Sequence, residues 1–363
     1  MSIVLPCLNE ERTLSKCIFG AREFAFFFGI DIEIVVADNG SVDGSKLIAA
    51  QEADTLIEVA TRGYGAALDA GIRAAKGEFI LIADSDLSYD FSQMAVFLEK
   101  LKRENFDLVV GNRFQGGVMQ GAMPWHHKHI GNPVLSFIGR LFFTSSIGDF
   151  HCGIRAFRKS SYLKSNLRSF GMEYASEMII KFASHSMNIT EIPVILSKDG
   201  RNRKPHLRSF RDGWRHLKLM LASAPQFTLL LPGALMLFMG SLGFLVLNRS
   251  DYINQSSPAL IEEVSRGLYL FGTTIFTLGS LDIAHKKSHG IGRFKWLPSN
   301  KSNSRKYLVL LTSYFFIFAG LYGVFLDSFI LKRIEGVYLL FSGCIFLVGA
   351  YLVQRILASG KLL

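Results

Sequence analysis

Four apolar stretches in the second half of the chain restrict its fold more than any other feature of the sequence. Each is close to the roughly 20 residues that a helix needs to cross the hydrocarbon core of a bilayer. They are Phe227–Leu247, Val264–Ala284, Tyr307–Ile330 and Val337–Ile356. Four such segments in series, with short connections, are hard to bury in a soluble core. We therefore expect residues 225–363 to form a domain of four transmembrane helices.

The basic residues predict an orientation for this domain. Residues 198–218 carry eight Lys and Arg, and the loop at 285–306 is also strongly basic. The loop Asn248–Glu263 contains Arg249 as its only Lys or Arg. Because cytoplasmic loops carry the excess of positive charge, we expect a multi-pass membrane protein with a cytoplasmic N-terminal domain, in the cytoplasmic membrane if the source is bacterial. The chain opens directly on a predicted strand, so we do not expect this domain to be exported.

Residues 1–205 have the pattern of a soluble α/β domain. Runs of Val, Ile and Leu alternate with helical stretches, and the strand-like runs are Ile3–Pro6, Ile32–Asp38, Leu56–Ala60, Phe79–Asp84 and Leu108–Gly111. Continuous apolar strands between helices predict a mostly parallel sheet covered on both faces. Ligands of such sheets bind beyond the carboxyl ends of the strands, where polar residues of this sequence gather, and this gathering predicts one cleft. The Gly-x-Gly-x-x-Gly fingerprint of dinucleotide-binding domains does not follow the first strand.

Paired carboxylates end the most apolar of these runs, in "FILIADSDLSYD". Asp84 and Asp86 are two positions apart, and positions i and i+2 of a strand share one face. Oxygen ligands of this kind suit Mg²⁺ or Mn²⁺, which bridge to substrate phosphates. The alternative for an isolated Asp-x-Asp is a cap or turn. The pair therefore predicts a divalent cation site at the strand end.

Six segments in this order give the chain a family resemblance: "SIVLPCLNEERTL", "IVVADNGSVDGS", "GYGAALDAGIRAAKGEFILIADSD", "VVGNRF", "DFHCGIRAFRK" and "RSFRDGWRHL". They resemble the family-two inverting glycosyltransferases, and more closely the polyprenyl-phosphate (dolichyl-phosphate-type) hexosyltransferases. The resemblance covers most of residues 2 to 218. It implies a Rossmann-like catalytic domain of the glycosyltransferase A type. It also implies transfer of a hexose from a nucleotide sugar (UDP-glucose or GDP-mannose type) to a polyprenyl phosphate, with inversion and with Mg²⁺ or Mn²⁺.

The resemblance also implies roles for residues of the donor site. Pro6, Asn9 and Glu10 would border the nucleotide, and Asp38 would bind the base. Asp84 and Asp86 would hold the metal on the diphosphate of the donor, which makes Asp86 catalytic. The position after Asp38 is commonly a second Asp in the family and is Asn39 here, which weakens a charge argument at that point.

The leaving diphosphate and the acceptor phosphate require positive charge. A phosphate monoester has a second pKa of about 6, so a polyprenyl phosphate is anionic near neutral pH and needs little help from a general base. Asp149 matches the family position near the acceptor and is taken as catalytic; its alternative is a turn residue before a strand. Arg113 is placed at the acceptor phosphate with a catalytic role, and Lys128 is placed near the same phosphate.

The basic stretch allows two interpretations. Residues 206–224 predict an amphipathic helix on the membrane surface, with Phe210 and Trp214 on its apolar side. Its charge could serve only to attract anionic lipid. Alternatively Arg201 and Lys204 bind the donor and Arg208 binds the acceptor phosphate. Nucleic-acid binding would use the same kind of charge, but adjacent membrane segments argue against it.

Two other functions compete with a hexosyltransferase. A processive polysaccharide synthase would share the catalytic core, but it usually carries Gln-x-x-Arg-Trp, which "RDGWRHL" does not match. A non-catalytic membrane carrier subunit is opposed by the intact carboxylates. His126, His127 and His129 lack the spaced partners of a zinc site. Gly233, Gly240 and Gly243 suggest that helices pack between subunits of a homo-oligomer.

Overall fold

The computed structural model describes residues 1–143, 147–201, 209–247 and 258–288. The chain divides into two compact units, Met1–Ser223 and Ala224–Leu363. We describe each unit by itself.

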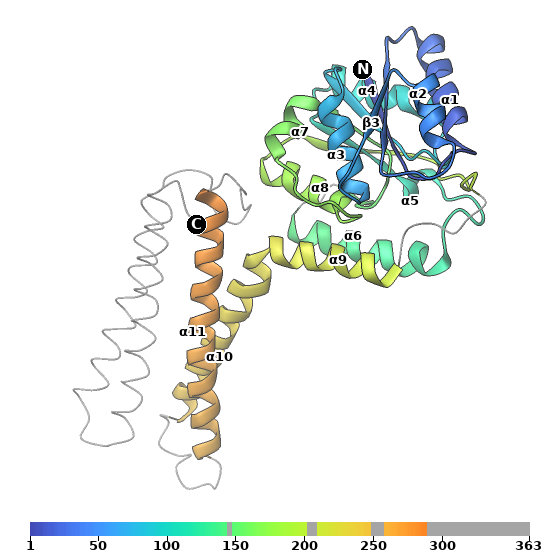
Figure 1. Ribbon diagram of the computed structural model, residues 1–363. Helices are drawn as coiled ribbons and strands as arrows, with labels where there is room; N and C mark the ends of the chain where they lie inside the picture. Colours follow the sequence, from blue (N-terminus) through green and yellow to red (C-terminus); the bar gives the residue numbers. More distant parts are fainter. Residues whose placement is uncertain (144–146, 202–208, 248–257, 289–363) are drawn as a thin grey trace. The chain divides into compact units, whose positions relative to one another are not determined.

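A seven-stranded sheet forms the centre of the first unit, with the order β3-β2-β1-β4-β6-β5-β7 (Figure 1). Its strands are β1 (Ser2–Cys7), β2 (Glu33–Asp38), β3 (Thr55–Glu58), β4 (Phe79–Ile82), β5 (Leu108–Asn112), β6 (Arg155–Arg158) and β7 (Ile189–Pro193). Strand β6 runs antiparallel to β4 and β5, whereas the other pairs are parallel. The predicted mostly parallel sheet is confirmed, and β6 and β7 extend it beyond the five runs that the apolar pattern indicated.

Helices flank this sheet, as the alternating pattern predicted (Figure 1). They are α1 (Leu14–Phe28), α2 (Ser45–Glu52), α3 (Tyr64–Ala74), η1 (Phe91–Gln93), α4 (Met94–Arg103), α5 (Arg113–Gly116), η2 (His127–Gly131), α6 (Asn132–Phe142), α7 (Lys159–Ser165), α8 (Tyr174–Ser184) and α9 (Ser209–Ser223). Helix α3 lies so close to the sheet that a Cβ on Gly71 would stand 2.6 Å from Val4 Cγ1. Glycine therefore sets the spacing between this helix and the central strands.

The core contains the central strands, whose residues Ile3–Leu5, Ile34–Val36 and Leu108–Val110 are fully buried. Burial on both faces explains why these strands read as continuous apolar runs instead of alternating ones. Cys7, Cys17 and Cys152 are free and buried in this core. Burial raises the pKa of Cys7 to about 11, so it is a neutral packing thiol. Cys344 lies outside the described residues.

Strand β4 ends at Ile82, two residues earlier than the sequence pattern predicted. Asp84 and Asp86 therefore lie on the turn that follows, and the strand alternation used to place them on one face does not apply. What brings them to one region is the turn itself, in which Ser88 N donates to Asp86 Oδ1 at 3.0 Å.

Helices α6 and α9 pack against one another along one side of the first unit (Figure 1). Helix α9 turns Asp212, His216 and Met220 inward, where all three are buried. Its aromatic residues Phe210 and Trp214 point outward, and Phe210 is 95% exposed. The structure thus groups α9, expected as a separate juxtamembrane segment, with the α/β unit.

The second unit is described over η3 (Gln226–Leu230), α10 (Leu231–Leu247) and α11 (Pro258–Ser288). Within the described residues, one helical segment, Gln226–Gly243, is long and apolar enough to cross a membrane. The stretch Val264–Ala284 falls within α11. The third and fourth predicted spans, Tyr307–Ile330 and Val337–Ile356, lie outside the described residues.

Small residues allow α10 and α11 to approach closely. A Cβ on Gly233 would stand 2.7 Å from the backbone nitrogen of Phe276, and one on Gly240 would stand 2.9 Å from the carbonyl of Ser265. Gly243 faces the side chain of Ser265 as well. These glycines therefore pack within one chain, and they no longer provide an argument for contacts between subunits.

Candidate active site

The nucleotide end of the predicted cleft is built where β1 and β2 end. Asp38 closes β2, and its Oδ1 accepts hydrogen bonds from Gly40 N at 2.9 Å and Ser41 N at 3.0 Å. Asn9 follows β1 with a left-handed backbone (φ 57°), and its Oδ1 accepts from Val42 N at 2.8 Å. The two strand ends are thus tied together by side chains that the sequence assigned to donor binding. Pro6 lies in β1 beside Ala37.

Asn39, the departure from the family pattern, supports a loop. Its Nδ2 donates to Thr61 O at 2.7 Å, and its Oδ1 accepts from Gly63 N at 2.7 Å. An amide can do both, because it carries a donor and an acceptor, whereas a carboxylate only accepts. Asn39 therefore fixes the segment that leads into α3, at the edge of the cleft.

Asp84 lies in a tight polar environment. Tyr64, the first residue of α3, donates from its hydroxyl to Asp84 Oδ1 at 3.0 Å. A Cβ on Gly153 would stand 2.4 Å from Asp84 Oδ2, so only glycine leaves room for this carboxylate. Burial and the neighbouring Asp86 raise the pKa of Asp84 to about 6. The shift shows that two carboxylates share one poorly solvated site, which a bound cation would relieve.

A third carboxylate completes this cluster. Glu10 lies after β1 and is buried. Thr13 connects it to the turn of Asp84 and Asp86, because its hydroxyl lies 3.3 Å from Glu10 Oε2 and donates to Ser85 O at 2.6 Å. Arg201 approaches from the far end of the domain; its Nη1 donates to Glu10 Oε1 at 3.2 Å and its Nη2 donates to Asp86 Oδ2. One cationic group is therefore held between carboxylates from two strand ends.

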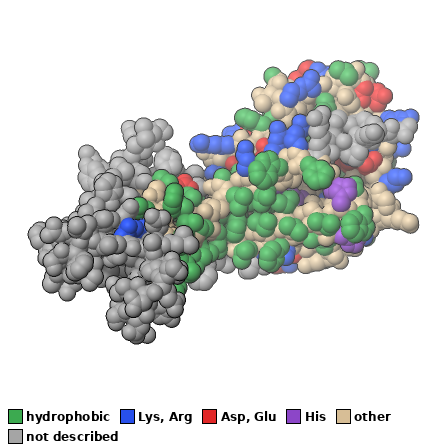
Figure 2. All heavy atoms as spheres, turned by 90° about the horizontal axis from the view of Figure 1, so that it is seen from below, with side chains coloured by type: hydrophobic (Ala, Val, Ile, Leu, Met, Phe, Trp, Pro, Cys, Tyr) green, Lys and Arg blue, Asp and Glu red, His purple; other side chains and the backbone are tan. Residues whose placement is uncertain are grey.

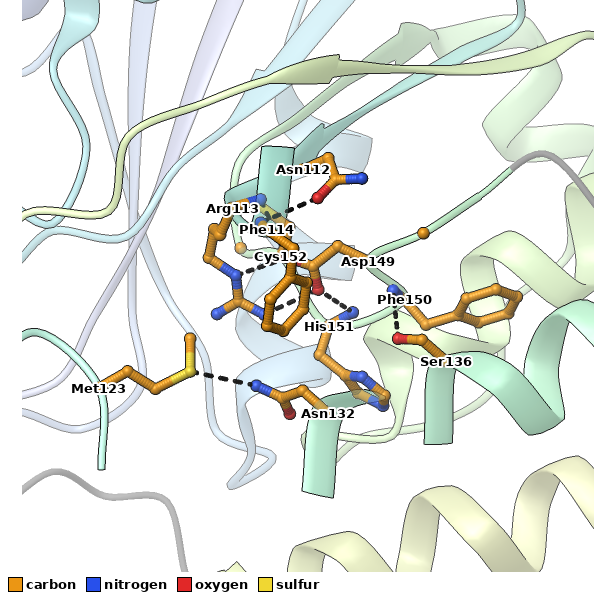
Figure 3. A network of polar contacts seen from close by, with 12 residues as sticks. Asn112, Arg113, Phe114, Met123, Asn132, Ser136, Asp149, Phe150, His151 and Cys152 are labelled. Atoms are coloured by element: carbon orange, nitrogen blue, oxygen red, sulfur yellow. Dashed lines mark hydrogen bonds and ion pairs between the residues drawn. The ribbon is translucent and has the colours of Figure 1, made fainter. Parts of the chain in front are cut away.

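The second charged group of the cleft is a buried pair of Arg113 and Asp149 (Figure 3). Arg113 Nε donates to Asp149 Oδ2 at 2.7 Å, and Nη2 donates to Oδ1 at 2.8 Å. Asp149 is fully buried and also accepts from the backbone nitrogens of Arg113 and His151. Such a forked pair fixes the plane of the guanidinium. In this structure Asp149 binds Nε and Nη2 of Arg113, and no hydrogen bond of Arg113 Nη1 is found among the described residues.

The loop that carries Asp149 is bound to helix α6. Phe150 N donates to Ser136 Oγ at 3.2 Å, and a Cβ on Gly139 would stand 2.5 Å from the Phe150 ring. Ser136 and Gly139 are the buried positions of α6, and Figure 3 shows Ser136 pointing at this loop. The position of Asp149, and through it of Arg113, therefore depends on α6.

Histidines connect α9 to η2, to α8 and to the loop of Asp149. His127 Nε2 lies 2.7 Å from Ser209 Oγ, at the start of α9. Farther along this helix, His216 Nδ1 lies 2.7 Å from Ser176 Oγ of α8, and the His216 ring stacks edge-on against His151 at 4.5 Å between centroids. Helix α9 is thus bound to α8 and to the loop of Asp149 through buried polar contacts.

We expect acidification to weaken this attachment. Burial is the largest cause that lowers the pKa of His216, from 6.5 to about 4, and Asp212 opposes it. Between those two pH values the unfolded chain binds a proton that the folded chain excludes. The folded state therefore loses stability as pH falls from 6.5 towards 4, by about 3 kcal/mol at about 1.4 kcal/mol per unit.

The slope of unfolding free energy against pH, measured for the full chain in detergent, tests this expectation. His216→Gln should reduce the slope between pH 6.5 and 4, because it removes one titrating group; the neighbouring His151, whose pKa is also lowered by burial, keeps part of the slope. The control is His185→Gln at the end of α8. An unchanged slope in His216→Gln would show that α9 is not held by a neutral histidine.

The remaining predicted residues are placed as follows. Lys128 lies half-buried in η2, next to His127. Lys204 and Arg208 lie outside the described residues. His126 and His127 lie against Ser209 Oγ at the start of α9, and the predicted absence of a zinc site at His126, His127 and His129 stays a prediction.

Several residues of the site were not predicted. Tyr64 and Thr13 lie within two of the segments that carry the family resemblance, but no role was assigned to them, because their roles depend on contacts with Asp84 and Ser85. Glu177 of α8 anchors a loop, because its Oε2 accepts from Ser169 N at 2.7 Å and from Arg168 N at 3.0 Å.

The first unit has a Rossmann-like sheet with carboxylates beyond its strand ends. This arrangement is that of a glycosyltransferase A domain, the class that acts on nucleotide sugars. The family model for glycosyl transferase family 2 matches residues 2–164. Residues 2–164 therefore match a family-two glycosyltransferase domain, and the resemblance to family two found in the sequence is confirmed.

Two relatives from Haloferax volcanii show the extent of the similarity. The low-salt glycan biosynthesis hexosyltransferase Agl6 is 34% identical over 233 residues, which are 64% of this chain and 56% of that protein. Glycosyltransferase AglJ is 26% identical over 212 residues, or 58% of this chain and 67% of that protein. The chain thus matches little more than half of Agl6.

Among solved structures, glucosyl-3-phosphoglycerate synthase from Mycobacterium tuberculosis, crystallised with Mn²⁺, uridine diphosphate and glucosyl-3-phosphoglycerate, is similar with a TM-score of 0.48 and 20% identity. The match covers 61% of this chain and 78% of that one. Similarity at this level does not extend to ligands.

Proposed function

We propose that the protein transfers a hexose from a nucleotide sugar, of the UDP-glucose or GDP-mannose type, to a polyprenyl phosphate at the cytoplasmic face of a membrane. The observation that carries the proposal is the contact of Glu10 and Asp86 with one cationic group, with Asp84 beside Asp86, beyond the strand ends of a family-two domain. Three carboxylates in one poorly solvated place require positive charge. A metal-bound diphosphate fits both that requirement and the family.

Mg²⁺ or Mn²⁺ is the proposed cofactor, held by Asp84 and Asp86. These residues fit a hard cation, because they offer carboxylate oxygens and Asp86 already binds the guanidinium of Arg201. When bound, such a cation stabilises negative charge on the leaving diphosphate. Glu10 lies near the ribose in this proposal, Pro6 and Asn9 border the nucleotide, and Asp38 faces the base.

Arg113 and Asp149 supply the acceptor side. Asp149 orients the guanidinium by its forked contact, and Nη1 of Arg113 then binds the acceptor phosphate. Lys128 and Arg208 are further acceptor-binding residues, and Arg201 and Lys204 bind the donor. The acceptor oxygen is already anionic near neutral pH, so the site has to position two anions next to one another more than it has to remove a proton.

An apolar face on the first unit supports a lipid acceptor (Figure 2). On η2 and α6 the exposed residues Ile130, Val134, Phe137 and Leu141 recur at helical spacing, and each is more than half exposed. Phe210 and Trp214 extend this face across α9. A soluble helix usually hides its apolar side, whereas an exposed apolar face bordered by Lys and Arg suits the bilayer interface.

This apolar face also lies on the helix that holds the proposed acceptor site. Ser136 and Gly139 on the inner side of α6 hold the loop of Asp149, so the apolar side and the acceptor site share one helix. Residues 206–224 and the proposed four-helix domain at 225–363 would then anchor the protein, with Gln226–Gly243 as the first span. We propose a multi-pass membrane protein on this basis.

Tryptophan fluorescence tests the contact with lipid. In proteoliposomes, lipids brominated near the headgroup should quench Trp214 and Trp125, because both side chains are exposed on or beside this face. Loss of the quenched signal in Trp214→Phe and Trp125→Phe reports each residue separately. Equal quenching of the wild-type protein and of both variants would place this face away from the bilayer.

Donor turnover tests the enzymatic part of the proposal. Purified protein should consume one nucleotide hexose from a panel of UDP and GDP sugars when polyprenyl phosphate is present. EDTA should stop this reaction, and Mg²⁺ or Mn²⁺ should restore it. Failure to use any nucleotide sugar with lipid and metal supplied would refute the proposed function.

A further inference from the structure

Arg201 occupies the place where the carboxylates of the cleft converge. Its side chain is 17% exposed, and it contacts Asp86 and Glu10, whose side chains are 4% and 6% exposed. Asp199 Oδ2 lies 3.9 Å from the same guanidinium. Arg201 is therefore enclosed by acidic groups, and its side chain is not exposed to solvent as that of a substrate-binding surface arginine would be.

The backbone around Arg201 is fixed. Gly200 N donates to Asp86 O at 2.8 Å, and Arg201 N donates to Asp199 Oδ1 at 3.2 Å. A Cβ on Gly200 would stand 2.9 Å from Leu87 and 3.0 Å from Thr13. Because the backbone is bound to the turn of Asp84 and Asp86, only the side chain of Arg201 has to rotate for its guanidinium to leave the carboxylates.

The guanidinium still has an unused donor. Arg201 Nε is buried and finds no hydrogen-bond partner among the described residues. A buried donor without a partner is costly. The carboxylate-bound arrangement therefore leaves Arg201 incompletely satisfied, and an anionic ligand could offer it a more complete set of acceptors.

We propose that Arg201 is an internal counter-cation that competes with the divalent metal for Asp86, so that free metal binds weakly and metal enters together with the nucleoside diphosphate. This inference rests on the proposed function. A cation that binds Asp86 Oδ2 has to displace Arg201, which loses its partners. The diphosphate gives the displaced guanidinium a bidentate anion in exchange, so diphosphate and metal favour each other's binding.

Mn²⁺ binding provides the test, measured by electron paramagnetic resonance of free Mn²⁺ with the full chain in detergent. Without nucleotide, Arg201→Ala should bind Mn²⁺ about 10- to 100-fold more tightly than wild type, the factor expected for one charged hydrogen bond. UDP or GDP should tighten Mn²⁺ binding to the wild type and have a much smaller effect on Arg201→Ala. Arg201→Lys keeps the charge and should stay close to wild type.

Lys46→Ala is the matched control. It removes a cation 3.9 Å from Asp38, which is another carboxylate of the cleft, and so changes the net charge equally. Its affinity for Mn²⁺ alone should equal that of wild type. Equal Mn²⁺ affinity in wild type and Arg201→Ala, or a gain in Lys46→Ala as large as in Arg201→Ala, would overturn the inference. If no variant binds Mn²⁺ even with nucleotide, the proposed metal site itself fails.

Discussion

Asp86→Asn should lower the rate of hexose transfer by about 10³-fold, the upper end of what loss of one charge-stabilising group costs an enzyme. Asn keeps the size of the side chain and the oxygen that accepts from Ser88 N. It removes the negative charge that we assign to metal binding. The fold should therefore persist, and kcat with saturating Mg²⁺ or Mn²⁺ is the quantity to compare.

Asp90→Asn is the control for this variant. Asp90 lies four residues farther along the same segment, is exposed, and caps η1 through a bond from Ser92 N. Asn also serves as a cap, so transfer should stay within about twofold of wild type. Near-normal transfer by purified Asp86→Asn would contradict the metal assignment.

Arg113→Ala should lower both stability and transfer. It leaves the fully buried Asp149 without its cationic partner, and breaking a buried pair from one side costs about 3–5 kcal/mol. The unfolding free energy in denaturant measures that loss. Transfer should fall by about 10²-fold in addition, because a guanidinium at the acceptor phosphate is lost.

A double variant separates these two effects. Arg113→Met with Asp149→Leu replaces both charges by apolar groups, a change that can be close to neutral for stability. We expect this protein to regain part of the lost unfolding free energy, because the backbone nitrogens of Arg113 and His151 still lose their acceptor, and to remain slow in transfer. Recovery of transfer along with stability would show that the pair is only a structural element.

The sequence was sufficient to predict the architecture of the first unit because its strands are buried on both faces. Runs such as Leu108–Val110 carry no alternation that could be confused with a half-exposed strand. The apolar pattern did not indicate strand β6. It contains "RAFR", whose Arg155 is fully buried because it donates to the carbonyls of Cys152 and Phe150.

Part of the candidate site can be read from the sequence for a similar reason. Carboxylates after strands are visible as a pattern, so the sequence indicated Asp38 and the Asp84–Asp86 pair as candidates. The partners that complete them come from distant segments. Arg201 is 115 residues from Asp86, and Asp149 is 36 residues from Arg113. Sequence spacing could not show that Asp149 is occupied by Arg113, or that Arg201 lies on the proposed metal ligands.

The apolar periodicity of helix α9 predicted the residues on its outward side but not those on its inward side. Its outward residues Phe210 and Trp214 are exposed, as an amphipathic helix at an interface predicts. Its inward side is polar, with Asp212 and His216 buried against the domain. Such contacts are specific to one tertiary arrangement, and the periodicity of apolar residues does not report them.

The most direct measurement follows a radiolabelled hexose from its nucleotide into lipid. Proteoliposomes containing the full chain would receive the labelled donor and metal, with or without polyprenyl phosphate. We predict label in a lipid-extractable product that carries one hexose on one phosphate, formed only when polyprenyl phosphate is present. Label in a growing polysaccharide would instead support a processive synthase, and a donor consumed without any lipid product would contradict the proposed acceptor.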